Sequence, residues 1–242
     1  MTGQVLTSIA GSRRPTLIFF GKDRGMAFFL GFLVITTVFL PMLTLSLFGR
    51  ISLSVFFGLM LVTGAFATIR HQALRYLVAG LALSTFTIDL AAEFTTYGLS
   101  IWETSLRLIC LSVLVLMTLK QTLRPGPVTI YRVMGGIAGY LLIGYTWVYV
   151  YQLLVQIVPA AIHFENGMSG LSRQPNDLVY FSFITLTTVG YGDVHPVHPV
   201  VRSMAVAEAL VGQLYVAILI ASLVGMALQT RSVGGDVESP RD

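Results

Sequence analysis

Six apolar stretches, each about as long as a membrane-spanning helix, constrain the fold of this chain more than any other feature of its sequence. A helix needs about 20 predominantly apolar residues to cross the hydrocarbon core of a bilayer. The stretches that meet this length lie near residues 26–46, 51–69, 76–97, 101–119, 130–157 and 200–228. A seventh apolar run, residues 176–187, is too short to span. The pattern therefore predicts an all-α membrane protein with six spans.

The composition favours the same class. The chain has 242 residues, of which 55% are hydrophobic and 11% are charged, whereas a soluble domain averages about 25% charged residues. The mean hydropathy is +0.80. The formal net charge of +4 does not indicate a nucleic-acid partner, because the basic residues lie between the apolar stretches. The one cysteine, Cys110, lies within the fourth stretch, so no intrachain disulfide is expected.

The distribution of Lys and Arg predicts the orientation of the chain. With six spans, alternate connections lie on opposite sides of the membrane. One side holds eleven basic residues, which are Arg13, Arg14, Lys22, Arg24, Arg70, Arg75, Lys120, Arg124, Arg132, Arg231 and Arg241. The other side holds three, which are Arg50, Arg173 and Arg202. Because cytoplasmic connections are enriched in Lys and Arg, both termini are predicted to be cytoplasmic.

A polar, glycine-containing segment, Thr187-Thr188-Val189-Gly190-Tyr191-Gly192-Asp193, follows the short apolar run. Glycine adopts left-handed backbone conformations at little cost, so Gly190 and Gly192 allow successive carbonyl groups to turn toward one axis. Non-helical backbone at membrane depth is tolerated only where it lines a cavity or is buried in protein. The alternative is an ordinary Gly-Tyr-Gly turn.

Residues Thr188, Val189, Gly190, Tyr191 and Gly192 resemble the selectivity filter of potassium channels, and Asp193 extends the match. In that family, backbone carbonyl groups from four chains replace the hydration shell of the ion. The resemblance implies that K⁺ is the only metal ion, that it is held at residues 188–191, and that no cofactor is needed. It also implies that the Thr188 hydroxyl adds an inner oxygen and that Tyr191 braces the filter.

The resemblance covers residues 130–229, as an outer helix, a re-entrant pore helix over 176–187, the filter and an inner helix. Together with the four preceding apolar stretches, this predicts a four-helix N-terminal transmembrane bundle followed by a potassium-channel pore domain with two helices and a re-entrant pore helix. Pro125 and Pro127 mark the boundary between them. The predicted parts are a cytoplasmic tail (1–25), a four-span bundle with degenerate voltage-sensor-like topology (26–124), the pore domain (125–230) and a disordered cytoplasmic tail (231–242).

Several residues are candidates for supporting the filter. Thr187 and Asp193 flank it, and Tyr180 and Phe181 occupy positions where many potassium channels carry a pair of tryptophans. In the sixth stretch, Gly212 is either a hinge or a site of close packing, because glycine weakens a helix by about 1 kcal/mol relative to alanine. If it is a hinge, helical spacing turns three residues toward the axis. These cavity-lining candidates are Gln213, Val216 and Ile220.

Charged residues within the apolar stretches form a second set of candidates. Carboxylates and guanidinium groups are costly in lipid, so they are expected to be paired. Arg107 lies in the fourth stretch at a depth between those of Asp89 and Glu93 in the third, and Glu103 is one turn away. Glu208, in the sixth stretch, is expected to reach hydroxyls such as those of Ser182 or Thr185. These expected contacts favour a structural role for Arg107 over voltage sensing, and a structural role for Glu208 over a role in gating.

Two other features carry less information. Voltage-gated channels have basic residues at every third position of the fourth span, whereas this chain has only Arg107 there, so strong voltage gating is not expected. His195 and His198 lie in a proline-containing loop. They are interpreted as exposed loop residues rather than as a metal site.

The sequence therefore predicts a homotetrameric potassium-selective channel of bacterial type, conducting passively in the plasma (bacterial inner) membrane, with no enzymatic activity. The expected partners are three identical chains and membrane lipid, with no nucleic acid. About a dozen residues follow the sixth stretch, too few for a cytoplasmic ligand-binding domain. The alternatives are a membrane sensor or scaffold with a vestigial pore, and a subunit of a K⁺ uptake transporter. The gating stimulus stays open among lipid, pH, tension and constitutive opening.

Overall fold

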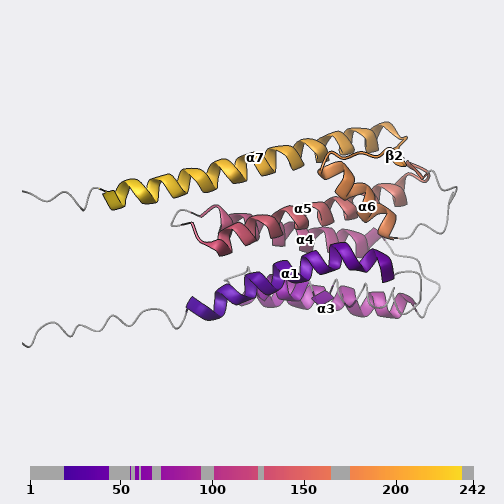
Figure 1. Ribbon diagram of the computed structural model, residues 1–242. Helices are drawn as coiled ribbons and strands as arrows, with labels where there is room; N and C mark the ends of the chain where they lie inside the picture. The colour runs from indigo at the N-terminus through magenta and orange to yellow at the C-terminus, as the bar shows by residue number, and fades with distance from the viewer. Residues whose placement is uncertain are drawn as a thin grey trace, which may run out of the picture.

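The computed structural model describes residues 19–43, 55, 58–59, 61–66, 72–93, 101–124, 128–164 and 175–235. Nearly all of these residues are helical (Figure 1). The helices are α1 (Phe19–Leu43), α3 (Gln72–Glu93), α4 (Ile101–Thr122), α5 (Ile130–Ile157), α6 (Pro175–Leu186) and α7 (Pro199–Gly235). Two short strands, β1 (Ile162–Phe164) and β2 (Val194–Pro196), form an antiparallel pair.

Three helices in these ranges are long and apolar enough to cross a membrane, namely α4, α5 and residues Pro199–Leu228 of α7. They coincide with the fourth, fifth and sixth predicted spans, so the prediction of an all-α membrane protein is supported. The first and third predicted spans overlap α1 and α3, and the second contains helical residues at 55, 58–59 and 61–66. That these segments also cross the membrane, as a four-helix bundle, stays a prediction.

The ends of two helices differ from the predicted boundaries. α1 begins at Phe19, inside the predicted tail of residues 1–25. α7 continues to Gly235, so residues 231–235 are helical and not part of a disordered tail. The helix ends at a Gly-Gly pair, and glycine is the residue that most often follows the last helical turn. Residues 1–18, 125–127 and 236–242, including the predicted boundary at Pro125 and Pro127, lie outside the described residues.

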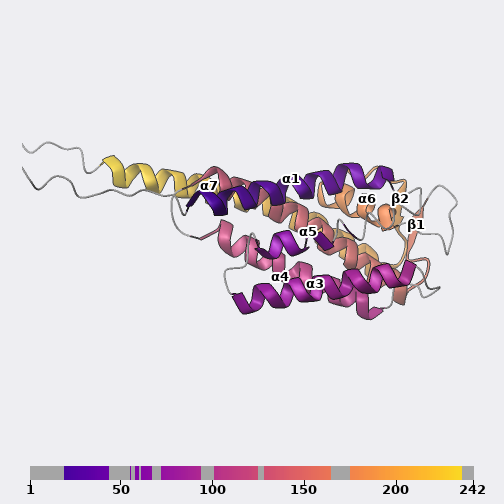
Figure 2. The same ribbon diagram turned by 90° about the horizontal axis from the view of Figure 1, so that it is seen from below.

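α5 lies at the centre of the packing. It contacts α4 and α1 on one side and α6 and α7 on the other, while α3 packs against α4 (Figures 1 and 2). The core between α1, α4 and α5 is filled by fully buried apolar side chains, including Phe29, Leu33, Leu111, Leu114 and Leu142. The N-terminal helices are thus attached to the rest of the chain through α5.

Glycines on α5 allow other elements to approach its backbone closely. A Cβ atom at Gly136 would lie 2.7 Å from the Leu219 side chain of α7, and one at Gly139 would lie 2.6 Å from the hydroxyl of Tyr215. These two glycines therefore let α7 pack closely against α5. Gly144 faces the ring of Phe183 on α6 instead, and Gly135 faces Thr122 of α4.

α7 is largely uncovered by the rest of the chain. Only 6% of its most apolar 18-residue stretch is buried against the rest of the chain. Large exposed apolar side chains occur along its length, such as Val206, Leu214 and Ile220. Its C-terminal part projects beyond the other helices in both views (Figures 1 and 2). An apolar helix exposed on several faces is expected to contact lipid or other protein chains.

The strand pair joins two connections that are far apart in sequence. β1 follows α5, and β2 follows the segment 187–193. The carbonyl of Ala161 also accepts hydrogen bonds from the backbone amides of Val197 (2.9 Å) and His198 (3.2 Å). The pair therefore ties the start of α7 to the end of α5, at the same end of the molecule as α6. The N-terminal end of α1 and the C-terminal end of α7 lie at the opposite end (Figure 1).

Gly212 lies where α7 crosses the end of α6. A Cβ atom at this position would collide with the carbonyl oxygen of Leu186, which is a backbone atom and cannot move aside cheaply. The close-packing role of Gly212 is therefore present, and the hinge role stays a prediction.

We expect Gly212→Ala to lower the free energy of unfolding by about 1–3 kcal/mol, because overpacking forces the backbone to shift. Gly225→Ala is the matched control, since no atom lies within 4 Å of a Cβ at Gly225 in the same helix. Thermal unfolding of the detergent-solubilised protein would check this. Equal melting temperatures for the two variants would contradict it.

Candidate functional site

The last turn of α6 binds the backbone of the segment that follows it. The amide of Thr187 donates to the carbonyl of Phe183 (3.0 Å), and that of Thr188 donates to Thr185 (2.9 Å). The amides of Val189 and Gly190 both donate to the carbonyl of Ile184, at 2.9 and 3.2 Å. A helix ordinarily ends with carbonyl groups that lack intrahelical partners. Here they accept the amide protons of the segment.

The backbone of the segment is in left-handed conformations at alternate residues. The φ angles are +60° at Thr188, +53° at Gly190 and +91° at Gly192. Within the part of the chain that the structure describes, no hydrogen bond is donated to the carbonyls of residues 188–191. Residues 187–192 are exposed. The amides of residues 187–190 thus donate to α6 while the carbonyls of residues 188–191 stay available as acceptors, which is the arrangement needed to bind a cation.

Gln213 of α7 contacts the inner end of this segment. Its side-chain amide donates to the Thr188 hydroxyl at 3.1 Å, so the two predicted site residues are brought together. Val216 and Ile220 are 42% and 57% exposed on the same helix. Their lining of a cavity stays a prediction.

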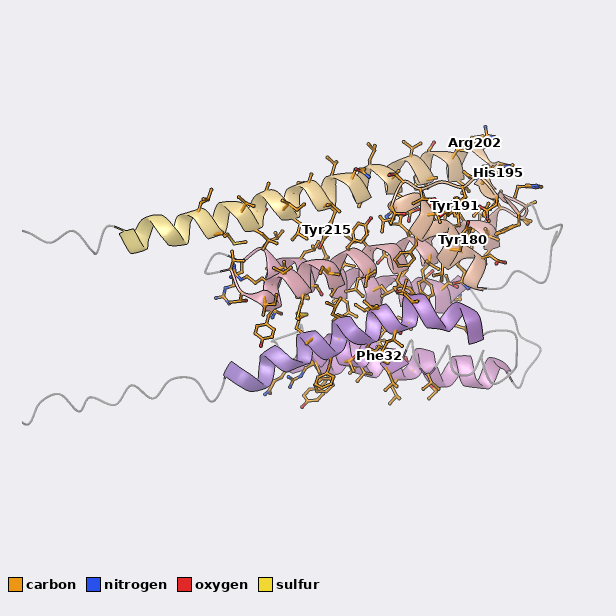
Figure 3. All side chains as sticks on the ribbon, viewed as in Figure 1. Phe32, Tyr180, Tyr191, His195, Arg202 and Tyr215 are labelled. Atoms are coloured by element: carbon orange, nitrogen blue, oxygen red, sulfur yellow. The ribbon has the colours of Figure 1, made fainter. Side chains whose placement is uncertain are left out.

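Tyr180 supports the outer end of the segment. Its hydroxyl donates to a carboxylate oxygen of Asp193 at 2.9 Å, and Tyr180 lies at the same end of the molecule as Tyr191 (Figure 3). Tyr191 itself is 73% exposed. Any bracing of its ring must therefore come mainly from outside this chain.

Phe181 does not reach the segment. It is 3% exposed and packs edge-to-face on the ring of Tyr151 of α5, with ring centroids 4.9 Å apart. The sequence placed it beside the filter by analogy with a tryptophan pair. Adjacent residues of a helix point about 100° apart, so when Tyr180 faces Asp193, Phe181 faces the supporting helix.

Glu208 of α7 is completely buried and lies between α5 and α6. The hydroxyl of Ser182 is 2.6 Å from one carboxyl oxygen, as predicted, and the hydroxyl of Tyr151 donates to the other at 2.6 Å. Ser182 Oγ also lies 2.9 Å from the carbonyl of Gly144. One hydroxyl proton cannot serve two acceptors. All three contacts can form together when the carboxyl group of Glu208 is protonated. It then donates to Ser182 Oγ and accepts from the Tyr151 hydroxyl, and the Ser182 hydroxyl donates to the carbonyl of Gly144.

Arg107 of α4 is 7% exposed, and its guanidinium carbon lies 5.9 Å from the centroid of the Tyr149 ring of α5. This is within the range of a cation–π interaction. Glu103 lies one turn earlier on the same helix. Asp89 and Glu93 are on α3, which packs against α4, but their side chains lie outside the described residues. Pairing of Arg107 with these carboxylates stays a prediction.

The two predicted loop histidines lie beside the outer end of the segment. His195 is exposed on β2, and its Nδ1 is 3.2 Å from the carbonyl oxygen of Gly192. His198 is partly buried, and its Nδ1 accepts a hydrogen bond from the amide of Val200 (3.4 Å). Among the described residues, no group of three or more His, Cys, Asp or Glu side chains could hold a metal ion.

Sequence reasoning missed the tyrosines of α5. Besides Tyr151, the hydroxyl of Tyr140 donates to the carbonyl of Leu186 at 3.2 Å, which satisfies another terminal carbonyl of α6. A signal was present, because a tyrosine hydroxyl within a membrane-spanning stretch needs a hydrogen-bond partner. The partner could not be identified from one helix alone.

Comparison with known proteins supports an ion channel of the pore-loop type. Residues 140–229 match the family described as "Ion channel". The matched part begins within α5 and contains α6, the segment 187–193 and most of α7. No curated protein matches the chain. The match is confined to well under half of the chain and includes none of α1, α3 or α4.

We expect Glu208→Ala to destabilise the protein by about 1–3 kcal/mol, because it leaves the buried Tyr151 hydroxyl without its acceptor, while Ser182 keeps the Gly144 carbonyl. Glu208→Gln should be nearly neutral, because an amide can donate to Ser182 and accept from Tyr151, as a protonated carboxyl does. Melting temperatures of the detergent-solubilised variants would test this. If Glu208→Gln proved as damaging as Glu208→Ala, the protonated arrangement would be wrong.

Proposed function

We propose that the chain is the subunit of a homotetrameric channel that conducts potassium ions selectively and passively. The observation that carries this proposal is that residues 188–192 have a filter-like sequence and also a backbone conformation held by hydrogen bonds to the end of α6. The amides of residues 187–190 donate to α6, and the carbonyl oxygens of residues 188–191 accept no hydrogen bond within the described residues, so they are available as backbone ligands. Potassium channels use such carbonyls in place of the hydration shell of the ion.

Four copies of the chain are needed because one segment cannot surround an ion. Ion-channel pores of this kind close with cyclic symmetry, so that the same exposed surface recurs around one axis. The exposed segment 187–192 and the exposed apolar surface of α7 support such an assembly, because both require a covering that the single chain does not supply. In it, Gln213, Val216 and Ile220 line the cavity below the filter, and Tyr191 is braced by an adjacent subunit.

The channel lies in a plasma membrane, the inner membrane of a bacterium, with both termini in the cytoplasm. The excess of basic residues on one side of the predicted spans supports this orientation. The N-terminal end of α1 and the C-terminal end of α7 lie together at the end of the molecule opposite α6, which agrees with this orientation. The proposed ion passes without a cofactor or a covalent step, so the protein is not an enzyme.

The four N-terminal spans act as a fixed support rather than a voltage sensor. Arg107 is the one basic residue within the fourth span. Moving one charge through 100 mV is worth about 2.3 kcal/mol, so four chains would supply at most about 9 kcal/mol. The contact of Arg107 with the ring of Tyr149 links α4 to α5 and favours a static role.

Reconstitution in liposomes would test the selectivity. We expect K⁺ and Rb⁺ to permeate and Na⁺ to permeate poorly, so that the reversal potential follows the K⁺ gradient. Tyr191→Asp should loosen the selectivity toward Na⁺, because the outer carbonyl ring loses its brace, while Tyr191→Phe keeps the ring and is the control. Absence of flux would favour a sensor or scaffold with a closed pore, and a reversal potential that ignores K⁺ would contradict the proposal.

We further expect open probability to change only shallowly with voltage between about −100 and +100 mV, since a fixed charge does no work in the field. Arg107→Gln should mainly lower stability and tetramer yield. Arg107→Lys keeps the charge but loses the planar group that stacks on Tyr149, so it should also be less stable. A steep conductance–voltage curve that flattens in Arg107→Gln and persists in Arg107→Lys would make Arg107 a sensor.

A further inference from the structure

Two histidines face each other on the strand pair at the end of the molecule that carries the proposed filter. His163 of β1 is directly opposite His195 of β2 in the antiparallel register. Their ring centroids are 5.0 Å apart, and the ring planes are inclined at 42°. Both side chains are exposed. Cross-strand neighbours in this position hold their side chains side by side, so the spacing is imposed by the backbone.

The spacing of the two rings fits one shared metal ion. Zinc binds imidazole nitrogen at about 2.0–2.1 Å in a tetrahedral arrangement, which places the centroids of two rings on the same ion roughly 5 Å apart. Imidazole suits Zn²⁺, Cu²⁺ and Ni²⁺, whereas Mg²⁺ and Ca²⁺ prefer oxygen ligands. The exposed position leaves room for water to complete the coordination.

The hydrogen bond of His195 prepares it as a ligand. Its Nδ1 lies 3.2 Å from the carbonyl oxygen of Gly192, so the proton of the neutral ring is held on Nδ1 and the lone pair is on Nε2. Histidines that bind metals commonly donate their other ring N–H to a carbonyl or carboxylate, which fixes the ring and raises its basicity. Gly192 is the outermost residue of the proposed filter. The same contact therefore connects the metal position to the conduction pathway.

The neighbouring polar groups do not compete for this role. His198 uses its Nδ1 to accept a hydrogen bond from the amide of Val200. Asp193 accepts a hydrogen bond from Tyr180. Arg202, near His195 in Figure 3, donates from Nε to the carbonyl of Pro196 at 3.0 Å. Its charge opposes a cation, and this repulsion weakens as the salt concentration rises.

The geometry points to a site for a divalent transition-metal ion, of the class of Zn²⁺, formed by His163 and His195 at the outer mouth of the channel. An ion bound there lowers potassium conduction, because it adds positive charge beside the entrance. It also polarises the imidazole ring of His195, which contacts the Gly192 carbonyl. The site itself rests on the strand pairing, the spacing of the two rings and the hydrogen bond of His195. Its effect on conduction rests on the proposed function.

Titration calorimetry of the full-length purified protein with zinc chloride would test the site. We expect saturable binding of one Zn²⁺ per chain, and no comparable binding of Mg²⁺. His163→Ala and His195→Ala should each weaken Zn²⁺ binding about 10-fold or more. His198→Ala is the matched control and should bind as the unmodified chain does. Size-exclusion elution would verify that each variant assembles normally.

Potassium flux from liposomes, measured with Zn²⁺ on the side of the strand pair, would test the coupling. Zn²⁺ should slow the flux of the unmodified protein and of His198→Ala, and should have little effect on His195→Ala. Equal zinc affinity in His163→Ala, His195→Ala and the unmodified protein would overturn the site even if potassium flux is normal. Specific zinc binding in a protein that passes no ions would support the site and contradict the proposed function. Specific binding with unaltered flux would overturn the effect on conduction.

Discussion

The arrangement depends on the hydrogen bonds that the end of α6 forms with the segment after it. Four consecutive amides, from Thr187 to Gly190, donate to carbonyls in the last turn of that helix. Without these bonds, the segment would need its own carbonyls to satisfy its amides, as a helix or a strand does. With them, the carbonyls stay free to face an ion. The negative end of the α6 dipole lies at the same place and also favours a cation.

The other contacts hold α6 in position. Tyr140 of α5 satisfies the carbonyl of Leu186, and Gly212 lets α7 cross directly over that residue. Glu208 joins α7 to α6 through Ser182 and to α5 through Tyr151. A buried polar network of this kind rigidifies its surroundings when every member is satisfied. Since α5 also contacts α1 and α4, the N-terminal helices are connected to the segment through α5.

The sequence predicted the helices of this half closely, because long apolar stretches mark the limits of α5 and α7 and a proline, Pro175, begins α6. The fifth predicted span has the same bounds as α5, and the contact of Glu208 with Ser182 followed from helical depth. The strand pair was not predicted, because strands of three residues show no alternation that can be read. The facing of Phe181 toward α5, and the placement of His163 opposite His195, depend on how separate elements approach each other. No local pattern encodes that approach.

The central claim is that the free carbonyls of four chains face one axis and bind potassium-like ions in a row. Crystals of the purified protein grown with Rb⁺ would test it most directly, because the anomalous scattering of Rb⁺ locates each ion independently of the protein. The account predicts four chains around a fourfold axis, with a row of Rb⁺ peaks on that axis between the carbonyls of Thr188 and Gly192. A different assembly, or a fourfold assembly with no Rb⁺ between those carbonyls, would contradict it.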